Sequence, residues 1–302
     1  MKLVVLERNT VGTDIDVSSF EQFGEVTYYG NTVKENVEEH IGDADIIIAN
    51  KAPINEETIQ NCPNVKLVCE FATGYDNVDL AYCKKRGIVV TNVKDYCTSS
   101  VAQHTFAMAL FLFEKLHYYD EYVKSGAYGA QDRFSNFDRR FCELEGKTWG
   151  IIGLGNIGRK VANIAKAFDC NVIYYSVTGK NSCKEYERVD FDTLLKESDV
   201  LSIHCPLRDL TRNNVARGAV VNNSDLAWAI CENVIAGAGL DVLEQEPIKE
   251  SNPLSKIMDS ERLIITPHMA WGSVEARTRI VDEACLNISA FLKGEKRNVV
   301  NE

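Results

Sequence analysis

Short apolar runs alternate with polar stretches between residues 2 and 92 of the chain. The runs are rich in valine and isoleucine and are bounded by turn-forming residues, which is typical of strands buried in a parallel sheet. They cover residues 2–7, 25–30, 45–50, 65–71 and 87–92. Polar stretches with helical character, such as residues 32–42, separate them. The alternation predicts an α/β domain with a parallel sheet.

The pattern changes at Thr98, where a longer apolar segment begins. Residues 98–125 are predicted to form one long helix, because small polar capping residues open it and Ser125-Gly126 closes it. Its middle, from Phe106 to Phe113, is apolar on nearly every side. A helix of that kind is buried on more than one face, so we expect it between domains or in the interface of a homodimer.

A second α/β unit begins at Lys147. Its strand-like runs lie at residues 148–152, 171–176, 199–206, 235–242 and 263–268, and residues 273–294 have the apolar spacing of a helix. We therefore expect an α/β protein of two domains with parallel sheets. One domain takes residues 1–97 and 272–302, and the other takes residues 98–271, including the long helix.

Composition narrows the class of protein. The chain has 302 residues, of which 45% are hydrophobic and 25% charged, as in soluble globular proteins. The net charge of −11 disfavours binding to nucleic acid or to an anionic membrane. No run approaches the roughly eighteen apolar residues of a membrane span, and no signal peptide is evident. None of the ten cysteines has C-x-x-C spacing, so we expect reduced thiols in a cytoplasmic protein.

The stretch GLGNIG follows one predicted strand and opens a predicted helix. In that context the G-x-G-x-x-G motif indicates a dinucleotide site, although a turn that binds nothing is the alternative. Gly153 makes the tight turn, Gly155 lets the backbone approach a pyrophosphate, and Gly158 allows close packing of the helix. We expect these glycines, with Asn156 and Ile157, to bind the cofactor at the helix N-terminus.

The residue that selects between the two nicotinamide dinucleotides should end the next strand. An Asp or Glu there grips the ribose 2′-hydroxyl group of NAD(H). In this chain the position falls on Ser176, with no acid nearby. Ser176, Thr178 and Lys180 are suited to a 2′-phosphate instead, so NAD(H) and NADP(H) both stay open.

Four chemically suggestive residues lie at or just past the ends of later predicted strands: Arg217, Asp241, Glu246 and His268. Open α/β sheets bind their ligands at the carboxyl ends of the strands. Histidine titrates near neutrality and is the commonest general acid or base. Together, beside a dinucleotide site, these residues predict a reaction centre.

Several stretches of the sequence are similar to those of a known enzyme family. They are FATGYDNVDL, SVAQHTFA, LEGKTWGIIGLGNIG, SIHCPL, VARGAVV, AGAGLDVLEQEP and TPHMAW. The chain resembles the D-isomer-specific 2-hydroxyacid dehydrogenase family over essentially its whole length. Asp138-Arg139 and Trp271 make it most similar to the glycerate dehydrogenases, also called hydroxypyruvate reductases, within that family. The resemblance implies a Rossmann-type nucleotide-binding domain and a flavodoxin-like substrate domain. It also implies reversible hydride transfer between a nicotinamide cofactor and a small 2-oxo or D-2-hydroxy acid.

The resemblance also assigns roles to single residues. His268 is expected to protonate the substrate carbonyl, and Glu246 to hydrogen-bond its imidazole. Arg217 is expected to hold the substrate carboxylate with its planar guanidinium group. Asp241 is expected to orient the nicotinamide carboxamide. The remaining positions are expected to bind substrate (Lys51, Thr73, Gly74, Trp271) or cofactor (His204, Cys205, Pro206, Ala216).

Other interpretations remain open on the sequence alone. His40, His104 and His117 are interpreted as structural helix residues. Two other functions are compatible with the same motifs. One is a dehydrogenase of another small anion, such as formate or phosphite, and the other is a non-enzymatic NAD(H) sensor like the family's transcriptional corepressors. The partners expected are therefore a small acid and a second copy of the chain, with no metal.

The segment after Pro206 departs from the family's pattern. In the family a crossover helix and a further strand precede the catalytic arginine, whereas here few residues separate Pro206 from Arg217. By comparison with the family, about seventeen residues are absent between Asn213 and Asn214, and a crossover between parallel strands needs about a dozen or more. We predict that the printed chain lacks a segment of the natural protein. Without it, a hole one strand wide is expected in the sheet beside residues 199–206.

Overall fold

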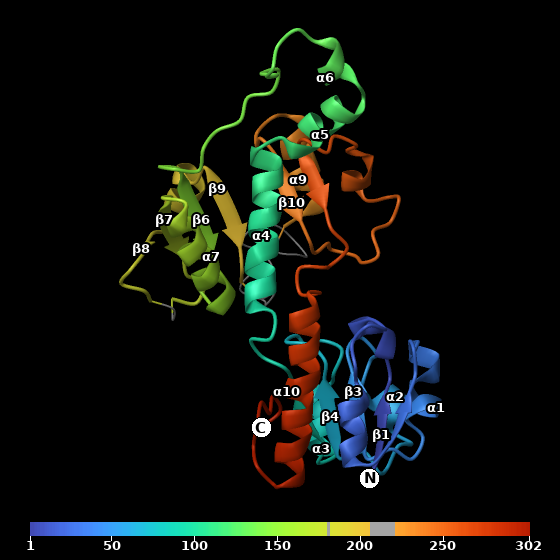
Figure 1. Cartoon of the computed structure of the whole chain (residues 1–302). Helices are drawn as coiled ribbons and strands as arrows, with labels where there is room; N and C mark the ends of the chain where they lie inside the picture. Colours follow the sequence, from blue (N-terminus) through green and yellow to red (C-terminus); the bar gives the residue numbers. More distant parts are fainter. Residues whose placement is uncertain (180–181, 206–220) are drawn as a thin grey trace. The chain divides into compact units, whose positions relative to one another are not determined.

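The computed structural model describes residues 1–179, 182–205 and 221–302. The chain divides into two compact units (Figure 1). Unit 1 contains Met1–Cys97 and Gly272–Glu302, and unit 2 contains Thr98–Trp271. The C-terminal residues therefore return to the unit that the N-terminal residues form.

Unit 1 is built on one parallel sheet. Its strands are β1 (Lys2–Val5), β2 (Glu25–Tyr28), β3 (Ile46–Ala49), β4 (Leu67–Glu70) and β5 (Val89–Thr91). They pair in the order β2-β1-β3-β4-β5, which is the flavodoxin-like order. Strands β3 and β4 are buried along their whole length, because helices cover both faces of such a sheet. The predicted parallel α/β fold is confirmed here.

The helices of unit 1 are mostly short. They are α1 (Val37–Ile41), α2 (Glu56–Ile59), α3 (Leu80–Lys85) and α10 (Val274–Leu292), with 3₁₀ turns η1 (Arg8–Val11), η2 (Ser18–Phe23) and η3 (Lys34–Asn36). The long helix α10 begins where the Ser273 side chain accepts a hydrogen bond from the backbone N–H of Ala276. Its apolar stripe, which includes Ile280, Ala284 and Ile288, is buried. The predicted C-terminal helix is thus present.

The described residues of unit 2 form two parallel sheets. The larger sheet has the order β8-β7-β6-β9, and the smaller pairs β10 with β11. The strands are β6 (Thr148–Ile152), β7 (Asn171–Tyr175), β8 (Glu187–Arg188), β9 (Val200–Ile203), β10 (Ala238–Leu240) and β11 (Leu263–Ile265). Helices α7 (Asn156–Ala167), α8 (Phe191–Glu197) and α9 (Asn223–Cys231) and the turn η4 (Pro253–Lys256) connect them. Trp149 and Tyr174 are both almost fully buried and belong to the hydrophobic core that packs on the larger sheet.

The helix predicted over residues 98–125 is broken, so that prediction is wrong in part. Helix α4 (Thr98–Phe113) ends before Lys115, whose φ of 54° is left-handed. A left-handed residue cannot continue a right-handed helix, and the chain resumes as α5 (Leu116–Lys124) and α6 (Ala127–Ala130). Helix α4 packs on α7 and also contacts β10 and β11. It therefore stands between the two sheets of unit 2 (Figure 1).

In the described residues the larger sheet ends at β9. Among the described residues, β9 pairs with β6 and with no second strand, and Leu201 on it is 37% exposed. The segment predicted to be missing, between Asn213 and Asn214, lies outside the described residues. No helix in the described ranges is long and apolar enough to cross a membrane.

Candidate active site

The turn after β6 has the geometry that its glycines predict. Gly153 has a φ of 92°, and a Cβ atom there would lie 2.9 Å from the backbone nitrogen of Cys205. A Cβ on Gly158 would collide with the carbonyl oxygen of Gly153. By contrast, Gly155 faces open space, with nothing within 4 Å of a Cβ. Helix α7 begins at Asn156 with no acid in its first turn, so a phosphate group fits at its N-terminus.

The end of β7 carries no negative charge. Ser176 follows the strand and is buried, with 4% of its surface exposed. Its carbonyl oxygen accepts the backbone N–H of Gly179 in a tight turn. Ile157, from the glycine motif, packs against the core of the larger sheet. Lys180, the cation expected nearby, lies outside the described residues.

His204 and Cys205 follow β9 directly. The His204 backbone N–H donates to the carbonyl oxygen of Ile152 over 2.8 Å, which continues the β6–β9 ladder. Burial lowers the pKa of His204 to about 4, so its ring is neutral at physiological pH. Burial raises the pKa of the Cys205 thiol, which therefore stays protonated. Pro206 and Ala216, the other expected cofactor contacts here, lie outside the described residues.

His268 and Glu246 form a direct pair. Nδ1 of His268 lies 2.7 Å from Oε2 of Glu246. The other carboxylate oxygen, Oε1, accepts the backbone N–H of Leu243 at 2.9 Å, so Glu246 is itself held in place. The imidazole is thereby fixed through one nitrogen, and Nε2 is the nitrogen left for proton transfer. The side chains of His268 and Glu246 are 38% and 33% exposed.

The carboxylate of Asp241 organises the turn that carries His268. Oδ1 accepts from the hydroxyl of Thr266 at 2.6 Å and from the N–H of Met269 at 2.7 Å. Oδ2 accepts the N–H of Ala270 at 2.9 Å. His268 has a left-handed φ of 56°, and its own N–H points to the carbonyl oxygen of Asp241. A carboxylate accepts about four hydrogen bonds, so these three leave room for one ligand donor.

Helix α4 contacts both ends of this turn. Nε2 of His104 lies 2.9 Å from the hydroxyl oxygen of Thr266. The hydroxyl of Ser100 donates to the carbonyl oxygen of Ala270 over 2.5 Å. Sequence reasoning treated His104 as a plain helix residue and missed Ser100 and Thr266. The sequence did contain a hint of the shared role of Ser100 and His104, because residues four positions apart lie on the same face of a helix.

The expected substrate residues of unit 1 lie in the loops after β3 and β4. The Lys51 side chain is exposed, while its backbone N–H donates to Glu7 at 2.7 Å. Thr73 and Gly74 are exposed. Their backbone N–H groups donate to no acceptor among the described residues, which suits an incoming carboxylate.

The two remaining expected residues lie in unit 2. Trp271, its last residue, is partly buried. Arg217, the expected catalytic arginine, lies outside the described residues. In the described ranges no cluster of three or more His, Cys, Asp or Glu side chains is placed to hold a metal ion.

Comparison with known families decides the identity. The sequence profile described as D-isomer specific 2-hydroxyacid dehydrogenase, catalytic domain, matches residues 4–301. The chain belongs to this family. The predicted family resemblance is therefore confirmed, and with it the class of two-domain α/β oxidoreductases that use nicotinamide cofactors.

Two curated members of the D-2-hydroxyacid dehydrogenase family are similar over nearly their full length. A hydroxypyruvate reductase of Blautia hydrogenotrophica is 37% identical over 326 residues, covering 100% of both chains. That aligned stretch is longer than the 302 residues here, so the relative has residues without a counterpart in this chain. A glycerate dehydrogenase of Methylorubrum extorquens is 33% identical, covering 99% of this chain and 98% of its own.

Solved structures of the family agree with the fold. An acyclic imino acid reductase in complex with NADPH and D-Arg is 27% identical, with a TM-score of 0.84 over 99% of this chain and 100% of its own. A D-lactate dehydrogenase of Aquifex aeolicus, complexed with NAD and lactic acid, is 26% identical. Its TM-score is 0.82, and the match covers 100% of this chain and 99% of that one.

Proposed function

We propose that this D-2-hydroxyacid dehydrogenase reduces a small 2-oxo acid with NAD(P)H, with hydroxypyruvate and glyoxylate as its substrates. The products are then D-glycerate and glycolate. The observation that carries the proposal is the His268–Glu246 pair, held at 2.7 Å beyond β11 in the same unit as the glycine turn. The relatives named hydroxypyruvate reductase and glycerate dehydrogenase support this choice of substrate.

The proton chemistry follows from the hydrogen bonds around His268. The bound nicotinamide cofactor supplies the hydride that reduces the substrate carbonyl carbon. Glu246 occupies Nδ1 of His268, so Nε2 gives its proton to the carbonyl oxygen. In the oxidative direction the same nitrogen takes the proton back from the hydroxyl group. Asp241 keeps the turn in shape and offers its remaining acceptor position to the nicotinamide carboxamide.

Substrate binding rests on groups that recognise a carboxylate. We assign the guanidinium of Arg217 to the carboxylate and the carbonyl oxygen, because its fork matches both in one plane. The free backbone N–H groups of Thr73 and Gly74 bind the carboxylate as well. Lys51 adds an exposed positive charge, and Trp271 an apolar wall.

The dinucleotide is held by the turn after β6. Its pyrophosphate would be held at the N-terminus of α7 by Gly153, Gly155 and Asn156. The neutral ring of His204 and the Cys205 backbone would bind the cofactor as well, and we assign Pro206 and Ala216, which lie outside the described residues, to the same role. NAD(H) and NADP(H) are both accepted, because no acid at Ser176 repels a 2′-phosphate group.

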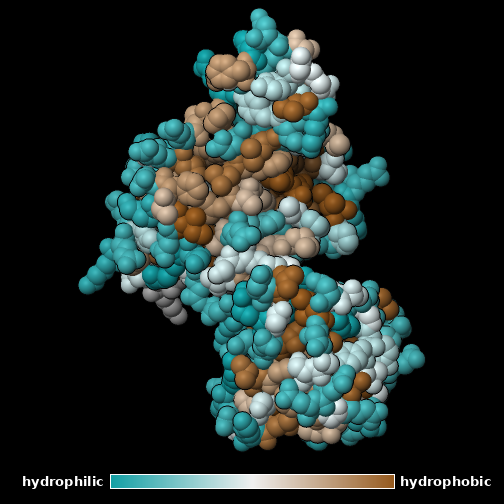
Figure 2. Space-filling view, in the orientation of Figure 1, coloured by the Kyte–Doolittle hydropathy of each residue, from teal (hydrophilic) through white to brown (hydrophobic). Residues whose placement is uncertain are grey.

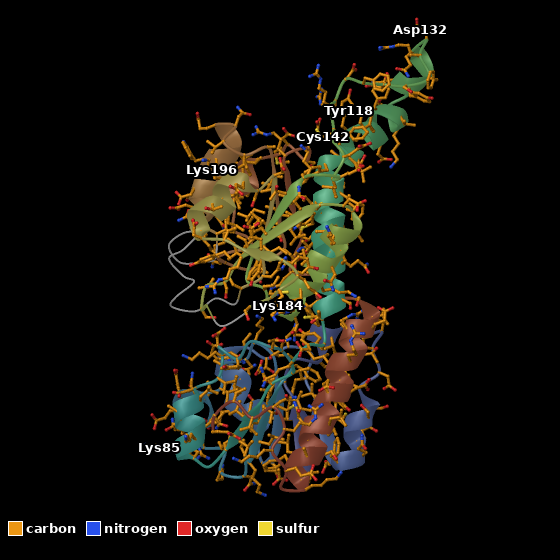
Figure 3. All side chains as sticks on the ribbon, turned by 90° about the vertical axis from the view of Figure 1, so that its left-hand side faces the viewer. Lys85, Tyr118, Asp132, Cys142, Lys184 and Lys196 are labelled. Atoms are coloured by element: carbon orange, nitrogen blue, oxygen red, sulfur yellow. The ribbon has the colours of Figure 1, made fainter. Side chains whose placement is uncertain are left out.

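Two copies of the chain form the working unit in this proposal. Apolar side chains gather on the face of unit 2 where α4 runs (Figure 2), and residues 107–113 of α4 keep part of their surface exposed. The segment between α4 and β6 includes Tyr118, Asp132 and Cys142 (Figure 3). It exposes further aromatic rings. Phe134 is 91% exposed and Phe137 is 79% exposed. A second copy would cover these surfaces, and light scattering at micromolar concentration tests the dimer.

The cytoplasm is the compartment we propose. All ten cysteines are free, although several lie at or near the surface, such as Cys142 and Cys231. Free thiols persist in reducing compartments, where disulfides are rare.

Initial-rate assays test the proposed reaction. Hydroxypyruvate, glyoxylate, pyruvate and phenylpyruvate are each offered with NADH and with NADPH, and His268→Gln serves as the blank. We expect the highest kcat/KM for hydroxypyruvate or glyoxylate. A higher value for pyruvate or phenylpyruvate would contradict the substrate assignment. Cofactor binding without turnover of any 2-oxo acid, formate or phosphite would instead show a dinucleotide sensor.

A further inference from the structure

A buried carboxyl group ends the interior strand β4 of unit 1. Glu70 is 0% exposed. Its Oε2 accepts a hydrogen bond from Nδ2 of Asn77 at 3.3 Å, and its Oε1 has no partner among the described residues. Burial raises the pKa of Glu70 well above its usual range, and the nearby Glu7 raises it further, while Asn77 and Lys51 act in the opposite direction. Burial therefore favours the neutral carboxylic acid form of Glu70.

Glu7, the second acid of this cluster, has a different task. Its Oε2 accepts three backbone N–H groups of the loop after β3, from Asn50, Lys51 and Ala52, at 2.8, 2.7 and 3.0 Å. Glu7 thus fixes the loop that carries Lys51 and places a negative charge beside Glu70.

Asn77 joins this loop to the one after β4. Its Nδ2 donates to the carbonyl oxygen of Ala52 at 3.0 Å as well as to Glu70. The two loops also pair through their backbones, because the Ile54 N–H donates to Asn77 and the Asp79 N–H donates back to Ile54, each at 2.8 Å. The loop of Lys51 and the loop of Thr73 and Gly74 are therefore tied together directly beside the Glu70 carboxyl.

We propose that Glu70 is a positioning residue that holds the two substrate-binding loops of unit 1 together through Asn77. Ionisation would place a second negative charge beside Glu7 in a fully buried position. Among the groups that face Glu70, only Lys51 is cationic, and its side chain is exposed. Burying that charge costs free energy, which is relieved where the loops part and admit solvent, so we expect substrate affinity to fall on the alkaline side.

The inference rests on the proposed function, because Thr73, Gly74 and Lys51 matter here as carboxylate-binding groups. It is separable from the role of His268, which lies in unit 2. A loss through Glu70 raises KM with little change in kcat, whereas a loss of the proton donor lowers kcat. The amide variant Glu70→Gln is the decisive tool, since it keeps the shape and the neutral charge but cannot ionise.

Steady-state kinetics of hydroxypyruvate reduction between about pH 6 and about pH 10 test the proposal, with saturating cofactor at every point. We expect the KM of the natural enzyme to rise toward alkaline pH and that of Glu70→Gln to stay level. Glu70→Ala should raise KM about tenfold or more at every pH, with kcat changed by less than about threefold. Glu56→Gln, an exposed acid at the start of α2, is the matched control. An equal alkaline rise in the Gln variant, or an unchanged KM in the Ala variant, overturns the proposal.

Hydrogen–deuterium exchange gives a second readout that needs no turnover and no Ala variant. Peptides over residues 50–54 and 71–79 are compared between the natural enzyme and Glu70→Gln at matched pH. We expect equal exchange near about pH 6 and faster exchange in the natural enzyme near about pH 9. Equal exchange at both pH values overturns the positioning role. If no 2-oxo acid is reduced but this difference appears, the proposed function fails while the role of Glu70 in the loops stands.

Discussion

The hydroxyl of Thr266 donates to Oδ1 of Asp241 over 2.6 Å. A hydroxyl has one proton, so the 2.9 Å contact between Thr266 Oγ1 and Nε2 of His104 requires the histidine to be the donor. The order His104 to Thr266 to Asp241 then fixes the direction of each hydrogen bond. Through it, helix α4 helps to hold the turn that carries His268.

Replacing Asp241 by Asn tests the turn. The Asn amide nitrogen is a donor and faces N–H donors wherever it points, so at least one of the bonds from Thr266, Met269 and Ala270 is lost. We expect kcat/KM to fall by about 10²-fold, since small misplacements of catalytic groups have that effect. Asp225→Asn, on the surface of α9, is the control. Full activity in the Asp241 variant would show that the turn keeps its shape without the carboxylate.

His104→Leu removes the first donor of the same series. The hydroxyl of Thr266 then loses its anchor on α4, and we expect kcat to fall about tenfold while the dissociation constant of NAD(P)H stays within about twofold. His117→Leu is the matched control, because His117 is a helix histidine whose nearest acid, Glu121, is exposed. Equal losses in the two variants would contradict a specific role for His104.

Variants of His268 and Glu246 should lose different amounts of kcat. His268→Gln removes the proton donor, and general acid catalysis contributes about 10²- to 10⁴-fold, so kcat should fall by that factor. Glu246→Gln keeps a side chain of the same size but weakens the hold on Nδ1, and a smaller loss is expected. Stopped-flow fluorescence checks that both variants still bind cofactor. Near-normal turnover by the His268 variant would remove it from the mechanism.

Cofactor preference should respond to charge at Ser176. An acid there would bind the 2′-hydroxyl group and repel a 2′-phosphate. Ser176→Asp is therefore expected to lower kcat/KM for NADPH by about tenfold or more and to change the NADH value little or favourably. The ratio of the two kcat/KM values, measured with one 2-oxo acid, checks this. An unchanged ratio would place the discrimination elsewhere.

Glu70 should also make stability depend on pH. Its pKa in the folded protein lies well above the ordinary 4.5, so the folded state holds the proton more tightly than the unfolded chain. The stabilising contribution of the neutral acid is complete below the unfolded pKa and is lost as pH rises toward the folded pKa. Glu70→Gln does not titrate, so its advantage in unfolding free energy grows by up to about 1.4 kcal/mol per pH unit in that window.

Urea unfolding at about pH 5 and about pH 8 measures the difference, with Glu56→Gln as the control. A stability gap that shrinks with rising pH would contradict the raised pKa. The kinetic and stability effects have the same cause, so both should be present in the same variant.

Local patterns predicted much of this fold. Strands such as β3 and β6 are continuous apolar runs, and the glycine motif predicts the turn at Gly153 because a side chain at Gly153 or Gly158 would collide with the backbone. The break at Lys115 escaped prediction, since the apolar pattern continues past it and only tertiary packing selects the left-handed residue.

The side-chain hydrogen bonds of the site could not be predicted from the sequence, for a different reason. His104 and Thr266 are 162 positions apart, and Asn50 and Glu7 are 43 apart, so only the folded chain brings them together. Glu70 stands in an apolar run, where a charged residue at a strand end usually indicates the surface. Its full burial follows from the loops that close over it. Arg217 stays a prediction, as does the segment missing between Asn213 and Asn214.

The β10–β11 pair, which carries the turn of His268, has a consequence for how the enzyme loses activity on warming. In the described ranges no main-chain ladder joins β9 to β10, so side-chain packing against α4 links the two sheets. The β10–β11 pair is short, and Val234 and Val242 around it are 61% and 57% exposed. Such a pair forms its own cooperative unit and opens at lower free energy than the larger sheet. Because the proposed proton donor His268 follows this pair, we expect catalysis to be lost at a temperature where most of the circular dichroism remains.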